Sequence, residues 1–298
     1  MENIILIPPC DTYGDVLSIV ALSLYLNEYY TNVYILFNNE SNKILQHYKH
    51  FFKKCDNHIY LVFRSDILQS ISSSPYDTYH VVNLYTGNWK HSLDNYKLYG
   101  NPKINSKHYY SDTNPFYVNL NIPDKYVHKP NITLPLKIPE VNSIVYYKMV
   151  GLNNNVRMDK FNYIRDFAME QTYYDKIISK YNINGKYNIV NSFKLPTGLI
   201  NNLDMKHINN DFPCINISNL CEFNGWLCKL IEQSEEIHLV DGTNTMFIYY
   251  CQYKNILNIN DHKIYYHDYI RPRAWTDFKL HYSVTMISNP LLSNWYII

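Results

Sequence analysis

Residues 236–250, EIHLVDGTNTMFIYY, contain the pattern that decides the fold. Ile237, Leu239 and Val240 make a short apolar run that predicts a buried strand, and the apolar run 246–251 predicts the first turns of a buried helix. A polar turn lies between them, made of Asp241, Gly242, Thr243, Asn244 and Thr245. Such a turn gathers unpaired backbone N–H groups at one place, where the helix dipole adds partial positive charge. The stretch therefore predicts either a phosphate site or an ordinary helix start capped by Asp or Thr.

The same alternation of strand and helix recurs on both sides of this stretch. In the first half we expect strands at 3–8, 32–37, 58–63 and 80–85, and helices starting at 16 and covering 43–54 and 66–72. In the second half we expect strands at 143–150, 187–192, 212–217, 236–240, 255–257 and 263–266, with helices at 159–181 and 223–233. Strands that alternate with helices through short links are typical of parallel sheets flanked by helices.

Prolines interrupt the alternation over 100–139, a polar stretch without sustained periodicity that we expect to be irregular. The alternation returns afterwards, so the sequence predicts an α/β protein with two Rossmann-like domains facing a cleft. We place the domains at 1–140 and 141–298, the second of which includes a C-terminal tail that starts at His267.

Composition excludes several classes of function. The net charge is +1 and no half carries a long run of one sign, so binding to nucleic acid is not expected. No apolar run reaches the roughly 18 residues of a membrane-spanning helix, and the chain starts directly with a strand rather than a signal peptide. The 6 cysteines show no CxxC pair or zinc spacing, so we expect free thiols and a cytoplasmic protein.

Segments from both halves of the chain resemble one class of enzyme. GDVLSIVALSLYLNEYYTNVYIL at 14–36 is similar to the first helix and second strand of heptosyltransferases. YIRDFAMEQTYYDKIISKYNINGKYNIVNS at 163–192, WLCKLIEQSEEIHLVDGTNTMFIYY at 226–250, and the tail pieces HDYIRPRAW and NWYII resemble small bacterial and viral glycosyltransferase-like proteins. The chain thus resembles glycosyltransferases of GT-B type, which are built from two Rossmann-like halves around a cleft.

The resemblance implies transfer of a sugar from a nucleotide-sugar donor to a hydroxyl of a glycan or another acceptor. The first domain would face the acceptor and the second would bind the donor, in the cytoplasm, or in the host cytoplasm for a viral protein. The alternative is an inactive relative of the same fold that binds a glycan or a protein, because fold alone does not fix function.

Sugar transfer needs a base for the acceptor hydroxyl. Our candidate is Asp15, which follows Gly14 at the start of the first helix, with Asp11 as the second choice and Tyr13 and Gly14 on the acceptor side. A helix N-terminus stabilises the ionised carboxylate. The alternative for Asp15 is an ordinary acid that caps the helix or lies in its first turn.

The donor's diphosphate needs hydrogen-bond donors and positive charge. The turn residues 241–245 would supply backbone N–H groups and threonine hydroxyls, and Gly242 would let a ligand approach the backbone. Lys194, Arg271 and Arg273 are the candidate cations, with surface charge as the alternative for the two arginines. Because no Asp-x-Asp occurs, we expect no metal and no cofactor beyond the nucleotide-sugar substrate.

Two further groups favour structural roles. Asp166 and Glu170 are like charges four residues apart on a predicted helix, which is unfavourable unless a cation such as Arg165 lies between them. We interpret these three residues as a structural charge network. His238 and His267 are interpreted as ordinary histidines rather than as ligands or bases.

Overall fold

The structure is a computed structural model, and both halves of the chain are described in it. The described residues are 3–7, 13–37, 50–52, 58–63, 66–67, 69, 79–84, 103, 147, 151–153, 155–192, 203, 205–218, 220, 223–240, 242–267 and 292–298. The predicted turn 193–198 and the tail residues 268–291 lie outside these ranges. The predicted irregular segment 100–139 is described only at Lys103, and the predicted helix 43–54 only at 50–52, which are helical.

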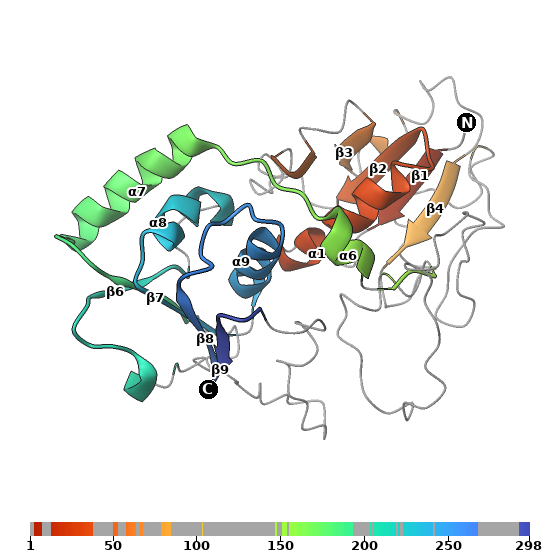
Figure 1. Cartoon of the computed structure of the whole chain (residues 1–298). Coiled ribbons are helices and arrows are strands. Elements are labelled where there is room, and N and C mark those ends of the chain that lie inside the picture. The colour runs from red at the N-terminus through yellow and green to blue at the C-terminus, as the bar shows by residue number, and fades with distance from the viewer. Residues whose placement is uncertain are drawn as a thin grey trace, which may run out of the picture. The chain divides into compact units, whose positions relative to one another are not determined.

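The first unit is built on a parallel sheet with the strand order β3-β2-β1-β4. Its strands are β1 (Asn3–Ile7), β2 (Asn32–Phe37), β3 (Ile59–Phe63) and β4 (Tyr79–Asn83), coloured red to orange in Figure 1. Helix α1 (Tyr13–Leu26) lies between β1 and β2 in the chain. Every residue of β1 and β2 is buried, as expected for strands that are covered on both faces of a parallel sheet.

The second unit is built on another parallel sheet, with the order β6-β5-β7-β8-β9. Its strands are β5 (Asn188–Asn191), β6 (Cys214–Asn216), β7 (Glu236–Val240), β8 (Lys263–His267) and β9 (Trp295–Ile297). Its helices are α7 (Phe167–Tyr181), α8 (Cys228–Glu232) and α9 (Thr243–Tyr253), with the short 3₁₀ helices η2 (Met205–His207) and η3 (Asn224–Leu227). The prediction of an α/β protein with two parallel sheets is confirmed.

The boundary between the units falls later than the predicted 140/141. The contacts group Met1–Asn162 as one unit and Tyr163–Ile298 as the other. The reason is that residues after 140 pack on α1: Tyr147 Oη donates a hydrogen bond to Ser18 O at 2.9 Å, and α6 (Asn155–Lys160) packs against α1. Lys160 of α6 also forms an ion pair with Glu28.

Three predicted elements differ from the structure. The single helix expected at 159–181 is two helices, α6 and α7, separated by residues 161–166, which have no regular secondary structure. Asp166 starts α7 as its N-cap, because its side chain accepts a hydrogen bond from Met169 N at 3.2 Å. Tyr147 is helical, although it lies in the predicted strand 143–150. The predicted strand 255–257 is the turn that ends α9, where Asn255 takes a left-handed φ of 53°.

Candidate functional site

The second sheet reverses its strand order between β5 and β7. From β5 the chain continues to β6 on one side and then returns past β5 to β7 on the other side. Because all five strands are parallel, their carboxyl ends meet at one edge of the sheet. Open parallel sheets bind ligands outside this edge, at the point where the strand order reverses. The passage from β7 into α9 lies at that point and is our candidate site.

Helix α9 starts at a glycine that supplies no side-chain cap. Gly242 is the N-cap of α9, its φ of 165° is extended backbone that any residue adopts, and no side chain caps the first turn from this position. The first intrahelical bond runs from Met246 N to Gly242 O at 3.1 Å. The alternative that a threonine caps this helix is therefore wrong, and Asp241 lies outside the described residues. Gly242 is buried, and its extended backbone angles do not require a glycine.

Thr245 does not have the role that the sequence predicted for it. Its side chain is buried, with 2% of the residue exposed, and its Oγ1 donates a hydrogen bond to Val240 O at 2.5 Å. That bond closes the turn onto the end of β7. Thr245 therefore stabilises the turn. Thr243 is partly exposed in the first turn of α9.

Neutral polar side chains gather at the carboxyl ends of β5 and β6. Asn191, the last residue of β5, accepts hydrogen bonds at Oδ1 from Asn244 Nδ2 at 3.0 Å and from Ser218 Oγ at 2.8 Å. Asn216, the last residue of β6, donates to Ser192 O and Oγ at 3.1 and 2.9 Å. Sequence reasoning missed this cluster, although each strand end was predicted to within one or two residues and a serine follows each strand within two residues.

The first sheet also reverses its order, with β2 and β4 on opposite sides of β1. Helix α1 is the element that follows β1, and Tyr13, Gly14 and Asp15 are its first three residues. The predicted base is therefore on the first turn of the helix that leaves the reversal point. The predicted residues Asp11, Lys194, Arg271 and Arg273 lie outside the described part of the chain.

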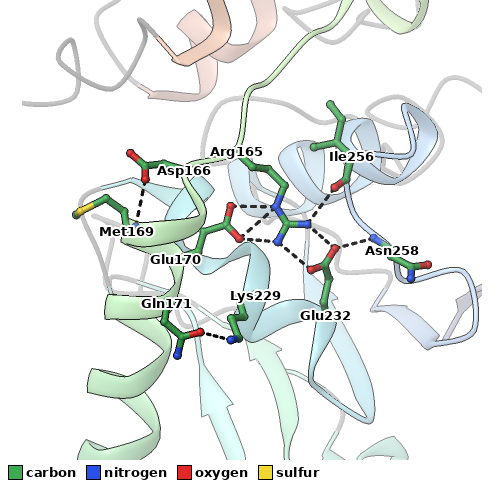
Figure 2. A network of polar contacts seen from close by, with 9 residues as sticks. All are labelled: Arg165, Asp166, Met169, Glu170, Gln171, Lys229, Glu232, Ile256 and Asn258. Atoms are coloured by element: carbon green, nitrogen blue, oxygen red, sulfur yellow. Dashed lines mark hydrogen bonds and ion pairs between the residues drawn. The ribbon is translucent and has the colours of Figure 1, made fainter.

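Arg165 is the centre of a charge network, as the sequence indicated (Figure 2). Its guanidinium pairs with Glu170 on α7, through Nε to Oε1 at 2.9 Å and Nη2 to Oε2 at 2.5 Å. It also pairs with Glu232 on α8, at 2.6 and 2.8 Å, and donates to Ile256 O at 3.2 Å. Asp166 turns away to cap α7.

This network is structural. Burial by itself lowers the pKa of Arg165, but the hydrogen bonds to Glu170 and Glu232 outweigh that effect and keep the pKa above its ordinary value. The side chain is therefore charged and joins α7, α8 and the loop after α9, where Glu232 Oε1 also accepts from Asn258 N at 2.8 Å. Because both carboxylates and the cation are engaged with each other, we assign the network no chemical role.

His238 and His267 form a buried pair on one face of the second sheet. His238 Nδ1 is 3.1 Å from His267 Nε2, and His238 Nε2 is 3.4 Å from Glu236 Oε2. Burial, the largest effect, lowers the pKa of His238, while Glu236 opposes it. The ring also stacks on Tyr265 with 4.7 Å between the ring centroids. These contacts agree with the interpretation of ordinary structural histidines.

Among the residues that the structure describes, no group of three or more His, Cys, Asp or Glu side chains is arranged to hold a metal ion. Of the helices described, none combines the length and apolar character needed to cross a membrane. Cys214, Cys228 and Cys251 are free thiols, and burial raises the pKa of each of them.

Comparison with known proteins gives one structural similarity to report. Neither a protein-family model nor a curated protein sequence matches the chain. Among solved structures, the chain is similar to the glycosyl transferase family 9 protein from Veillonella parvula DSM 2008. The two are 9% identical, the match covers 89% of this chain and 80% of that chain, and the TM-score is 0.46. At this level of similarity, a functional assignment has to rest on the geometry of the chain's own residues.

Proposed function

We propose that this protein is a glycosyltransferase of GT-B type that moves a sugar from a nucleotide-sugar donor to a hydroxyl of a glycan or another acceptor. The observation that carries the proposal is the start of α9 at Gly242, a residue without a capping side chain, at the point where the second sheet reverses its strand order. Nucleotide-sugar transfer creates a diphosphate leaving group, and an exposed helix start binds such an anion through its N–H groups and its dipole. A cytoplasmic location, in the host for a viral protein, belongs to the same proposal.

The donor's diphosphate is assigned to the start of α9. Backbone N–H groups of Thr243 and Asn244 are the donors, and the Thr243 hydroxyl adds one more. Gly242 is proposed to let a phosphate oxygen approach the backbone because it has no Cβ, and its extended φ of 165° does not by itself require a glycine. Lys194, Arg271 and Arg273 are proposed to neutralise the charge of the leaving group. These cations take the place of a divalent metal, so activity is expected to persist in EDTA.

The acceptor hydroxyl is assigned to Asp15. Its position in the first turn of α1 stabilises an ionised carboxylate, which is the form that accepts a proton. General base catalysis of this kind contributes roughly 10²–10⁴-fold to turnover. The acceptor binds on the side of the first unit, next to Tyr13 and Gly14.

The decisive experiment is a thermal-shift screen with a panel of nucleotide sugars, followed by turnover assays with the donor that stabilises the protein. A ligand that binds only the folded state raises the melting temperature with its concentration, so one donor should stand out from the others. No stabilisation by any nucleotide sugar would refute the proposal. Stabilisation without turnover on any acceptor would favour the inactive binding module.

Two variants separate the two assignments. Asp15→Asn should leave donor affinity nearly unchanged and lower turnover by about 10²–10⁴-fold, because the base acts on the acceptor. Gly242→Val should lower donor affinity, with Gly242→Ala giving a smaller loss because its added group is smaller. If Asp15→Asn lost donor affinity while Gly242→Val kept it, the assignment of the two units would be reversed.

A further inference from the structure

The amide of Asn191 has donors that the described residues do not use. Asn191 is the last residue of β5 and is 2% exposed. Its Oδ1 accepts two hydrogen bonds, from Asn244 Nδ2 at 3.0 Å and from Ser218 Oγ at 2.8 Å. An amide oxygen has two lone pairs, so this oxygen is fully used. The two N–H bonds of Asn191 Nδ2 have no acceptor among the described residues.

Such an arrangement needs an explanation, because buried side-chain N–H groups nearly always have a hydrogen-bond partner. The two bonds to Oδ1 already hold the amide in place. One donor, Asn244, lies in the first turn of α9, and the other, Ser218, lies in the segment after β6. Asn191 Nδ2 is not among the fully buried side-chain atoms that lack a partner, so it reaches solvent, where a water molecule or a bound ligand can accept its hydrogen bonds.

The position of the amide indicates what that molecule presents. Asn191 ends β5 at the strand-order reversal, and it is tied to Asn244, the second residue of α9. The N–H groups of the Asn191 side chain thus lie at the same place on the sheet edge as the first backbone N–H groups of α9, although they come from a different element. N–H groups suit an oxyanion, and the start of a helix suits a phosphate.

We propose that Asn191 Nδ2 donates a hydrogen bond to a phosphate oxygen of the ligand held at the start of α9. The inference rests on the proposed function, in which that phosphate belongs to the diphosphate of the nucleotide sugar. It adds a binding residue on β5 to a site otherwise made by α9. Since the donor is a neutral amide, its contribution does not change with pH over the range in which the protein is folded.

Asn191→Asp tests this directly, because aspartate has nearly the same shape as asparagine. The carboxylate still accepts from Asn244 and Ser218, and the helix N-terminus favours its charge, but burial of that charge opposes folding, so the melting temperature without ligand should fall. The variant has lost the N–H donors and repels an anion. Affinity for inorganic pyrophosphate, and for the donor found in the screen, should fall by about 10- to 100-fold or more, the usual worth of a hydrogen bond to a charged group.

Asn210→Asp is the matched control. It makes the same chemical change at an exposed residue in the loop before the amino end of β6, away from the carboxyl edge. It controls for the added negative charge and should change pyrophosphate affinity by less than about 2-fold, since exposed charges at a distance are screened by salt. Asn191→Ala, which removes the donors without adding charge, decides the matter if Asn191→Asp does not fold.

The outcomes separate this inference from the proposed function. Isothermal titration with pyrophosphate should show a lower affinity for Asn191→Asp than for the wild type, and an affinity close to that of the wild type for Asn210→Asp. If Asn191→Asp or Asn191→Ala folds and binds pyrophosphate and the donor as tightly as the wild type, Asn191 is structural only, and the proposed function stands without it. If the wild type binds neither pyrophosphate nor any nucleotide sugar, both proposals fail.

Discussion

Replacing Arg165 by Met should be among the most destabilising single changes in the second unit. The guanidinium is the shared partner of Glu170 and Glu232, with side-chain exposures of 13%, 1% and 17% for Arg165, Glu170 and Glu232. Arg165→Met keeps an apolar chain but leaves two carboxylates without their cation. Removing one partner of a buried ion pair costs about 3–5 kcal/mol, because the remaining charge stays buried and unpaired.

Lys186→Met is the control for this change. Lys186 pairs with Glu235 at 2.9 Å, but the two side chains are 61% and 36% exposed, so water already solvates both charges. Exposed pairs of this kind contribute about 0–1 kcal/mol. The two variants thus remove the same kind of interaction in different surroundings, and their difference measures the effect of burial.

Urea unfolding followed by tryptophan fluorescence measures both changes, because Trp226 and Trp295 lie in the second unit. With a urea m value of about 2 kcal/mol/M, a loss of about 4 kcal/mol lowers the midpoint by about 2 M. Adding Glu170→Gln and Glu232→Gln to Arg165→Met should recover part of the loss, since the unpaired charges are then gone. A cost below about 1 kcal/mol for Arg165→Met, or one equal to that of Lys186→Met, would refute the reasoning.

Two further predictions concern packing and pH in the same unit. Gly225→Ala should lower the unfolding free energy by about 1–3 kcal/mol, because a Cβ there would come within 2.2 Å of Tyr163 Oη and 2.4 Å of Phe223 Cε1. Tyr163→Phe in the same chain removes the closest atom and should recover part of the loss; no recovery would place the strain elsewhere. For His238, burial lowers the pKa in the folded state, so as pH falls below about 6.5 the unfolded chain binds the proton first and stability is lost. The unfolding free energy is measured at pH 7.5 and 5.5 for the wild type and for His238→Gln. The wild type should lose more unfolding free energy between these two pH values, by at most about 1.4 kcal/mol per pH unit. An equal loss in both proteins would contradict the lowered pKa of His238.

The strands could be predicted because their residues carry a strong local signal. Residues 32–37, NVYILF, were expected as a strand and form β2 with those bounds, since a short apolar run rich in β-branched and aromatic residues favours a strand buried on both faces. The alternation of such runs with helices then implied parallel sheets. That inference needed no tertiary information, which is why the α/β class followed from the sequence.

The division of the predicted helix 159–181 could not be found in the same way. The break at 161–166 depends on where Phe161 and Tyr163 pack. Phe161 lies against Phe51 in the first unit, while Tyr163 packs on Phe223 and Phe247 in the second. Helical periodicity continues through these residues, so only the tertiary contacts show that Phe161 packs in the first unit and Tyr163 in the second.

The candidate site shows the same limit. The turn 241–245 was recognisable because its residues are consecutive, but the bond between Asn191 and Asn244 joins residues 53 positions apart. The pairing of Arg165 with Glu232 spans 67 positions and could not be predicted from the sequence. The pairing of Arg165 with Glu170 spans only five positions and could be predicted. Thr245 was misjudged because its hydroxyl bonds a backbone carbonyl that no pattern of side chains marks.

The place of β1 in its sheet has a consequence for how the chain is made. β1 is the inner strand between β2 and β4, and Asn3 is in register with Asn32 on one side and with Tyr79 on the other. The ribosome makes β1 well before β4, so one hydrogen-bonding edge of the apolar strand β1 stays unpaired until β4 has been synthesised. Pairing between distant parts of a chain is slow, and unpaired apolar strands are prone to aggregate. The sheet of the first unit can therefore be completed only after β4 has been made, and slower translation before residue 79 lengthens the time during which the nascent chain needs protection.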